Sequence, residues 1–416
     1  MCQIKIKNFG PIKDGYTEQD GWLDIKKITV LIGNQGSGKS SVAKLISTLR
    51  WLEKALYQGK ITEKEATSYN RFVSTYCAYH NLRNYFDKEG KTEIEYIGIA
   101  YHIIYNNGKL RINALNTEGY LVPKIMYVPA ERNFLSAVKF RNLEKLKELP
   151  LSLFTFLEEL ERSQNDLSDT IQLPIGNAHF EFDKLNETAN IVGDGYKLKL
   201  SEASSGFQSF VPLFLVSQNL SASIHKELDA TKSTLSSEEQ KRIDTETINI
   251  LSDRALSYEV KVAALRLLSA KFKNQCFINI VEEIEQNLFP VSQKDMLFNL
   301  LQYANENAAN GLILTTHSPY IISYLSIAIQ GSHLMTQLKT SADTQQLYAR
   351  MEKVVPVKSV VMASDVVVYQ LDNVGNIQKL ANYEGIPSDK NFLNVSLADS
   401  GLLFDELLAI EEDLNK

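Results

Sequence analysis

The sequence predicts an α/β fold in which a mixed central sheet is flanked by helices and carries a helical insertion. Residues 2–9 alternate with period two and residues 24–33 become continuously apolar, which is typical of an outer strand followed by a central one. A helix is predicted directly afterwards, because the apolar residues from Val42 to Leu56 recur at steps of three and four. Residues 217–274 are instead highly charged and rich in helix formers, which indicates the insertion.

Turn signals divide the rest of the chain. Asn107-Gly108 separates two apolar runs and predicts a β-hairpin subregion over about 92–130. Alternating residues between 179 and 200 predict further strands, and short apolar runs at 276–281 and 311–316 predict two buried strands. The predicted organisation is therefore a head formed by residues 1–216 and 275–416, with 217–274 available as an interface for a partner or for oligomerisation.

Charge and composition limit the classes of partner. The 416 residues are 44% hydrophobic and 23% charged, enough for a large core, and the net charge of -6 argues against a surface coated with base for DNA. A local basic run exists at Lys139, Arg141, Lys145 and Lys147, but its simpler interpretation is a solvated helix face.

The three cysteines, Cys2, Cys77 and Cys276, lie far apart in the sequence and lack the spacing of a zinc site. This usage is typical of a reducing compartment. No segment approaches the roughly 20 apolar residues that a membrane span needs. We therefore expect a cytoplasmic protein without a membrane partner.

The stretch "GNQGSGKSS", Gly33 to Ser41, has the spacing G-x-x-x-x-G-K-[ST] between a predicted strand and a predicted helix. In such a loop the backbone N–H groups turn toward phosphate oxygens, the lysine reaches the β- and γ-phosphates, and the serine can bind Mg²⁺. The sequence therefore predicts a P-loop that binds a nucleoside triphosphate, through Gly33, Asn34, Gly36, Ser37, Gly38, Lys39, Ser40 and Ser41.

The stretch "CFINIVEEIEQNLFP", Cys276 to Pro290, raises two alternatives. It could be a buried strand beside the P-loop strand, with Glu282 near Mg²⁺ and Glu283 orienting the attacking water. It could equally be the acidic start of a surface helix. His317 ends the next apolar run, "LILTT", although a lone histidine is more often structural than catalytic.

A small-residue turn precedes an apolar helix at "SEASSGFQS". Ser204, Ser205 and Gly206 could form a second anion contact at the helix N-terminus. By themselves they are also an ordinary helix N-cap, since serine is strongly preferred there.

Taken in order, these four motifs resemble ATP-binding-cassette (ABC) ATPases, and in particular their soluble RecF/SMC-like branch. The resemblance covers residues 3–59 and 124–325, with "GNQGSGKS" similar to the Walker A motif, "SSGFQS" to the signature, "INIVEEIEQNLFP" to the Walker B and D-loop, and "LTTHSP" to the switch-histidine loop. It is most similar to the ATPases of phage-defence systems, namely the OLD-family nucleases and the ATPase subunits of Septu and PARIS. "VPAERN", Val128 to Asn133, resembles a short segment of these proteins.

The resemblance implies a role for each motif residue. Lys39 and Ser40 would hold ATP and Mg²⁺, Glu283 would polarise water, and His317 would sense the γ-phosphate. Ser204 and Gly206 would contact the ATP of a second subunit, so that a homodimer of heads sandwiches two ATP molecules.

Three features depart from the family pattern, and one of them is that "SSGFQ" is loose relative to the form found in transporters. Glu282 stands where many members carry aspartate, so its contact with Mg²⁺ differs in length. No glutamine matches the Q-loop, and Arg132 is the candidate near that position. Glu285 would lie in the D-loop, near the dimer interface.

Three functions follow from the sequence. The leading one is a Mg²⁺-dependent ATPase that gates a separate effector, a nuclease, in antiviral defence, because the residues after His317 carry no recognisable nuclease motif. The alternative is a RecF-like DNA-binding ATPase of DNA repair or chromosome maintenance. A third possibility is a nucleotide-gated scaffold with negligible turnover.

Overall fold

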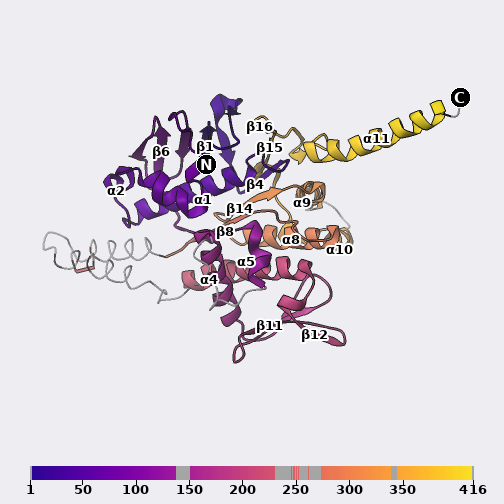
Figure 1. Cartoon of the computed structure of the whole chain (residues 1–416). Coiled ribbons are helices and arrows are strands. Elements are labelled where there is room, and N and C mark those ends of the chain that lie inside the picture. Colours follow the sequence, from indigo (N-terminus) through magenta and orange to yellow (C-terminus); the bar gives the residue numbers. More distant parts are fainter. Residues whose placement is uncertain are drawn as a thin grey trace.

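The computed structural model describes residues 2–136, 150–229, 245, 247, 248, 250, 252, 261, 273–338 and 344–414. Figure 1 shows a central body with a small sheet on either side and one helix, α11 (Phe392–Leu414), that extends away from it. The predicted α/β class is confirmed. The basic run at 139–147 lies outside the described residues, and so does most of the predicted insertion at 217–274; residues 217–229 continue helix α5 (Ser205–Asp229).

A seven-stranded sheet forms the centre of the fold. Its order is β2-β16-β15-β4-β14-β13-β8, and the five strands from β15 to β8 are parallel to their neighbours. β16 runs antiparallel to β15, so the sheet is mixed, as predicted. The strands are β2 (Gly15–Tyr16), β4 (Ile28–Gly33), β8 (Pro123–Val128), β13 (Cys276–Val281), β14 (Gly311–Thr316), β15 (Val366–Leu371) and β16 (Asn376–Lys379).

The strand order corrects one expectation. β13, which carries the glutamates, was expected beside β4, which leads into the P-loop. Instead β14 lies between them and pairs with both, through Leu314–Val30 on one side and Leu314–Val281 on the other. The histidine strand therefore separates the glutamate strand from the phosphate loop.

Each face of this sheet is covered by its own apolar core. Side chains of a strand alternate between the faces, and on β4 Ile28, Val30 and Ile32 enter one cluster while Leu31 enters the other. The first cluster includes α4 (Leu151–Asn165), α5, α8 (Pro290–Asn305) and α9 (Pro319–Leu338). The second holds α1 (Lys39–Tyr57), whose predicted apolar face from Val42 to Leu56 is buried.

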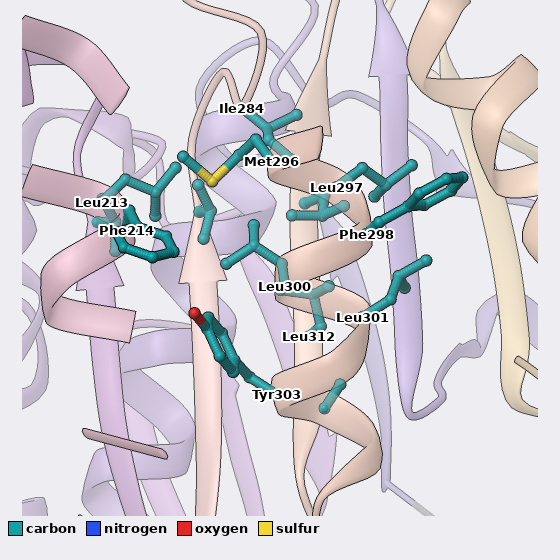
Figure 2. Packing of buried hydrophobic residues seen from close by; sticks show 14 of the residues in the cluster. Leu213, Phe214, Ile284, Met296, Leu297, Phe298, Leu300, Leu301, Tyr303 and Leu312 are labelled. Carbon is teal, nitrogen blue, oxygen red and sulfur yellow. The ribbon is translucent and has the colours of Figure 1, made fainter. Parts of the chain in front are cut away.

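Helix α8 is central to the first cluster. Figure 2 shows Met296 and Leu300 of α8 with Leu213 of α5 and Leu312 of β14, all fully or almost fully buried. Ile284 also enters this cluster and is completely buried. Burial of such a side chain contributes about 1.5–3 kcal/mol, so the turn that follows β13 is anchored in the core.

A five-stranded antiparallel sheet of order β3-β1-β5-β6-β7 covers α1. The predicted hairpin around Asn107-Gly108 is present between β6 and β7. However, β8 belongs to the central sheet, so the hairpin subregion ends at Ala114 and does not reach residue 130. The strands are β1 (Cys2–Lys7), β3 (Leu23–Ile25), β5 (Glu93–Ile97), β6 (Tyr101–Asn106) and β7 (Lys109–Ala114).

The remaining elements are small. A four-stranded antiparallel sheet has the order β12-β11-β10-β9. Its strands are β9 (Ile171–Gln172), β10 (His179–Asp183), β11 (Thr188–Gly193) and β12 (Tyr196–Lys199). The other α-helices and β-strands of the described residues are α2 (Glu63–Thr67), α10 (Thr344–Glu352), β17 (Asn382–Tyr383) and β18 (Ile386–Pro387). Among the helices of the described ranges, none is both long and apolar enough to cross a membrane.

Candidate nucleotide site

The carboxyl ends of the parallel strands bring the predicted site residues to one edge of the sheet. β4 leads into the P-loop, β13 into Glu282 and Glu283, and β14 into His317. The same edge receives β8, which is followed by the 3-10 helix Ala130–Ser136. In open parallel sheets, ligands bind outside the carboxyl ends of the strands. The sheet therefore brings the P-loop, the two glutamates and His317 to one edge although they are far apart in sequence.

Two glycines give the P-loop its shape. Gly33 has φ 147°, and a Cβ placed there would lie 2.3 Å from the carbonyl oxygen of Leu371. Gly36 has φ 77°, and a Cβ there would meet no atom within 4 Å. Gly33 is thus required for packing against β15, whereas the backbone at Gly36 faces open space where a phosphate group can approach. Gly38 is the residue before α1, and Asn34 is exposed at the loop tip.

Lys39 begins α1 and is buried, at 4% exposed. Its Nζ donates hydrogen bonds to the carbonyl oxygens of Gly33 and Asn34, each at 2.8 Å. Burial lowers the pKa of Lys39 to about 8, and the charges of Glu283, Glu285 and Glu282 oppose that shift. A buried ammonium group that is held only by neutral carbonyls is well placed to turn toward a phosphate anion.

The serines of the loop differ in burial. The Oγ of Ser37 is buried and has no hydrogen-bond partner, which leaves a donor available inside the loop. Ser40 is half-buried on the first turn of α1, and Ser41 is buried behind it. These donors and the N-terminus of a 19-residue helix are features that favour an anion.

Glu282 is only 3% exposed, and its Oε1 accepts no hydrogen bond. Lys44 of α1 has its Nζ 3.9 Å from that oxygen. A buried carboxylate oxygen without a hydrogen bond is costly unless a cation lies near it. Within the described ranges, no three His, Cys, Asp or Glu side chains cluster as a metal site. Ser40 and Glu282 nevertheless fit Mg²⁺, because this ion is usually held by one or two protein oxygens together with phosphate and water.

Glu283 adopts a left-handed backbone conformation, with φ 44°. Its N–H donates to Thr315 Oγ1 at 3.0 Å, which ties the end of β13 to β14. Its Oε1 lies 3.7 Å from His317 Nε2, and its side chain is about one third exposed. Burial and the charge of Lys39 lower the pKa of His317, while a hydrogen bond with the backbone of Gly33 opposes them. His317 is therefore neutral at physiological pH and lies between the P-loop and Glu283.

Glu285 lies in the turn after β13 and bonds to the loop after β14. Its Oε1 accepts a hydrogen bond from the backbone N–H of His317 at 2.5 Å, and its Oε2 is buried without a partner. Burial raises the pKa of this carboxyl. The Glu285 side chain joins the turn after β13 to the loop after β14, and its place near a dimer interface stays a prediction.

Arg132 was the candidate near the Q-loop position, but its guanidinium is fully buried and bonds to the protein backbone. It donates to the carbonyl oxygens of Glu282 and Glu283, each at 2.7 Å, and to those of Pro129 and Ser209 at 3.3 and 3.2 Å. Burial lowers its pKa to about 10, so it stays charged. Arg132 thus holds the main chain of the two glutamates in place, and its contact with a nucleotide stays a prediction.

The signature-like turn is exposed and does not line the P-loop pocket of its own chain. Ser204 and Ser205 precede and begin α5, and Gly206 packs against the turn after β13, where its Cβ position is 3.2 Å from the carbonyl oxygen of Asn287. Asn287 Nδ2 also donates to Ser209 Oγ at 3.0 Å. The signature-like and D-loop-like segments are therefore in direct contact.

A pocket of about 790 Å³ opens over the P-loop. Its walls come from the loop tip, the start of α9, the loop after β15 and the first turns of α11, through Asn34, Gln35, Gly36, His317, Pro319, Asn373, Leu393, Ser396 and Leu397. The sequence predicted the loop and histidine walls. It did not predict the α11 wall or the partner Lys44 of Glu282, since both depend on contacts between distant segments.

Comparisons with known proteins give likenesses of fold. No protein-family model matches the chain, and no curated protein matches it in sequence. It is similar to the SMC head domain from Thermotoga maritima at 10% identity over 91% of this chain and 98% of that one, with a TM-score of 0.35. It is similar to an SmcHead bound to the C-winged helix domain of ScpA at 11% identity over 91% of this chain and 97% of that one, with a TM-score of 0.35. It is similar to the dimeric ATP-binding cassette MJ0796 bound to ADP and Pi at 11% identity over 92% of this chain and 100% of that one, with a TM-score of 0.27.

Likenesses of this size do not place the chain in a family. The geometry stands by itself: an α/β protein brings a glycine-rich phosphate loop, two glutamates and a histidine to one edge of its central sheet.

Proposed function

We propose that this protein binds and hydrolyses ATP as an ABC-type ATPase. One observation carries the proposal. Lys39, Glu283 and His317 follow β4, β13 and β14 at the same edge of the sheet, and His317 Nε2 lies 3.7 Å from Glu283 Oε1. A phosphate loop next to a carboxylate and a neutral imidazole has the groups that phosphoanhydride hydrolysis requires.

The residues have separate tasks in this proposal. The loop N–H groups and the N-terminus of α1 hold the phosphates, and Lys39 exchanges its two backbone carbonyls for phosphate oxygens. Glu283 accepts a hydrogen bond from the attacking water and orients it, and His317 donates to the γ-phosphate or contacts it through water. Ser40 and Glu282 would hold Mg²⁺, which when bound neutralises phosphate charge.

Two copies of the head are proposed to complete the site. Ser204 and Ser205 are exposed and separate from the P-loop pocket of their own chain, which leaves them free to face the ATP of a second copy. The D-loop-like turn beside them ends in Phe289, which is 74% exposed. An exposed aromatic side chain next to such a turn is typical of an interface.

Substitutions test the activity directly. Lys39→Ala should lose at least tenfold in affinity for a fluorescent ATP analogue. Glu283→Gln should keep nucleotide binding but lose more than a hundredfold in phosphate release and accumulate an ATP-bound dimer, which light scattering detects. Exposed Lys64→Ala on α2 serves as the matched control. Unchanged phosphate release in Glu283→Gln would remove the assignment of the water-orienting residue, and slow turnover with nucleotide-dependent dimerisation would favour a scaffold.

We further propose that the ATPase controls a separate effector, a nuclease in antiviral defence. The positions of two elements after His317 support this proposal. β15 pairs with β4 in the central sheet, and α9 packs in the core of the head. β15 and α9 therefore belong to the head itself. Nuclease activity of the purified chain that survives Lys39→Ala would contradict the proposal.

The RecF-like alternative makes a different prediction. A DNA-binding ATPase should bind duplex DNA with an affinity that falls steeply with salt, and reversal of charge at Lys139, Arg141, Lys145 and Lys147 should abolish that binding. Binding that remains unchanged between 50 and 200 mM salt, or that is absent, would exclude this alternative.

A further inference from the structure

Helix α11 leaves the body of the protein with an uncovered apolar side. Figure 1 shows it extending from its attachment near β15 and α9 into space that the described chain does not fill. Leu403 is 69% exposed, Leu407 63% and Leu414 82%. Scattered single apolar residues on a surface need no explanation, but a contiguous apolar face marks an interaction site.

The spacing makes this a continuous face. Leu403, Leu407, Ile410 and Leu414 follow one another at steps of four, three and four, so they form one stripe along the helix. Phe404 and Leu408 lie beside the stripe on one side, and both are more than 40% exposed. We call these six residues the apolar face of α11: Leu403, Phe404, Leu407, Leu408, Ile410 and Leu414.

The charges of α11 are all of one sign. Between Phe392 and Leu414 the helix contains six acidic residues and no lysine or arginine. The 100° step per residue places Asp405 and Glu412 opposite the stripe of Leu403, Leu407, Ile410 and Leu414. Glu406 lies at one border of the stripe and Glu411 at the other, between Leu407 and Phe404. The stripe thus has an acidic surround, and Glu411 divides it from Phe404 and Leu408.

The root of α11 is fixed beside the nucleotide pocket. The Phe392 N–H donates to Gln370 Oε1 at 3.0 Å, and Gln370 belongs to β15, where it pairs with Ile32 of the P-loop strand. Asn391 is buried, and its Oδ1 accepts the N–H groups of Leu393 and Asn394, each at 3.1 Å. Since Leu393 also lines the P-loop pocket, a single helix connects that pocket to the apolar face.

From these features we infer that the apolar face of α11 is the docking site for a partner protein that presents an apolar groove bordered by lysine and arginine. Such grooves recognise a helix by apolar side chains at steps of three and four. The acidic surround favours a groove with a basic rim. This inference rests on the proposed function, because the partner would be the effector that the ATPase controls.

Two other occupants fit the charges less well. A second copy of α11 would bring six further acidic residues against the first six, and like charges at such an interface are destabilising. A membrane surface is generally anionic and attracts helices with basic polar faces, which is the opposite of the composition here. The basic-rimmed groove is therefore the occupant that the charges favour.

A defined probe tests the recognition chemistry on the full-length chain. The probe is a fluorescent 21-residue peptide of leucine and lysine in a heptad pattern, and the counter-probe is the same peptide with glutamate in place of lysine. We expect the leucine–lysine peptide to bind, with an affinity that falls as salt rises, and the leucine–glutamate peptide not to bind.

The decisive variant is Leu403→Asp/Leu407→Asp, which adds negative charge yet should weaken binding of the leucine–lysine peptide more than tenfold. The matched control Leu185→Asp/Val354→Asp adds the same charge at two other residues, which are 97% and 61% exposed, and should bind as the unmodified protein does. Equal binding by both double variants would mean that the peptide only senses overall charge, and would overturn the inference.

The same variants distinguish between the other possible occupants of the apolar face of α11. Loss of self-association in Leu403→Asp/Leu407→Asp alone, measured by light scattering, would show that a second copy covers the face and would overturn the inference. So would α11-dependent binding to phosphatidylserine vesicles. A photo-crosslinker at Phe404, introduced in the native host, should label a protein whose purified form binds the unmodified chain and not the double variant.

Failure of this inference can be told apart from failure of the proposed function. ATP binding and phosphate release are measured on the same samples, and both double variants should retain them. Normal ATPase activity together with unchanged peptide binding by Leu403→Asp/Leu407→Asp rejects the docking site alone. Absence of ATP binding by the unmodified chain would reject the proposed ATPase function, but it would not affect the result of the peptide-binding experiment.

Discussion

The Arg132 guanidinium donates a hydrogen bond to the carbonyl oxygen of Glu283 at 2.7 Å. This contact holds a residue whose backbone is in the left-handed region, a conformation that costs about 1 kcal/mol or more for a residue other than glycine. A buried cation therefore fixes the main chain of the residue proposed to orient water. The side chain of Glu283 stays available because Arg132 binds only its backbone.

Removal of this cation should disturb stability and activity together. Arg132→Ala would leave buried carbonyls without donors, and we expect a loss of about 3 kcal/mol in the free energy of unfolding. Arg132→Lys keeps a charge but not the forked geometry, so it should fold and still lose at least tenfold in phosphate release. Arg111→Ala, on the exposed side of β7, should change stability by less than about 0.5 kcal/mol. Full activity in Arg132→Lys would contradict the positioning role.

Two glycines of the P-loop should respond differently to alanine. Gly33→Ala places a methyl group 2.3 Å from the Leu371 carbonyl oxygen, and we expect a loss of more than about 2 kcal/mol. Gly36→Ala meets no atom within 4 Å, so its cost should be only the roughly 1 kcal/mol of a positive φ. Urea unfolding without nucleotide measures both. Similar costs for the two variants would show that the contact with β15 is not what requires glycine at position 33.

The ion pair of Lys44 and Glu282 predicts that Mg²⁺ affects the stability of the protein. Lys44→Met removes the cation 3.9 Å from the buried Glu282 Oε1, so the metal-free protein should lose about 1–3 kcal/mol of stability. Mg²⁺ should then raise the melting temperature of Lys44→Met more than that of the unmodified protein, since it replaces the missing charge. Thermal unfolding with and without MgCl₂ checks this, with Lys64→Met as the exposed control. An equal effect of Mg²⁺ on the melting temperatures of Lys44→Met and the unmodified protein would show that Glu282 does not bind the metal.

His80 predicts a pH dependence of stability. Its ring is buried with Nε2 3.0 Å from Ser47 Oγ, and burial lowers its pKa to about 3 from the ordinary 6.5. Below pH 6.5 the unfolded chain binds a proton at His80 that the folded chain does not, so the free energy of unfolding should fall as pH decreases toward 3. The expected slope from this residue is about 1.4 kcal/mol per pH unit.

His80→Gln should remove that slope, while His179→Gln, at an exposed position, should keep it. Urea unfolding at pH 7.5, 6.0 and 5.0 gives the comparison. If the unmodified protein and His80→Gln lose stability in parallel, the acid sensitivity comes from other groups.

The sequence predicted what depends on local chemistry. The P-loop lies between a strand and an amphipathic helix because glycine spacing and apolar periodicity are both local signals, and the structure places Gly33 to Ser41 there. The mixed sheet and its flanking helices were predicted for the same reason. The catalytic and binding roles of Lys39, Glu283 and His317 stay predictions, although the sheet brings these residues to one edge.

The order of the strands could not be predicted in the same way. β14 lies between β4 and β13 because residues almost 300 positions apart, such as Val30 and Leu314, pair with each other. No periodicity encodes such a pairing. The backbone role of Arg132 and the inward turn of Glu285 were missed for the same reason, since a charged residue in a loop gives no sign of whether it will be buried.

The place of β4 in the sheet has a consequence for synthesis of the chain. Both of its hydrogen-bonding neighbours, β14 and β15, are made of residues beyond 310. At roughly 5–20 residues per second on the ribosome, the strand that carries the phosphate loop waits on the order of 15–55 s with both edges unpaired. A nascent strand of this apolarity, "ITVLIG", is a natural substrate for chaperones. We therefore expect the yield of folded protein to depend on the speed of translation.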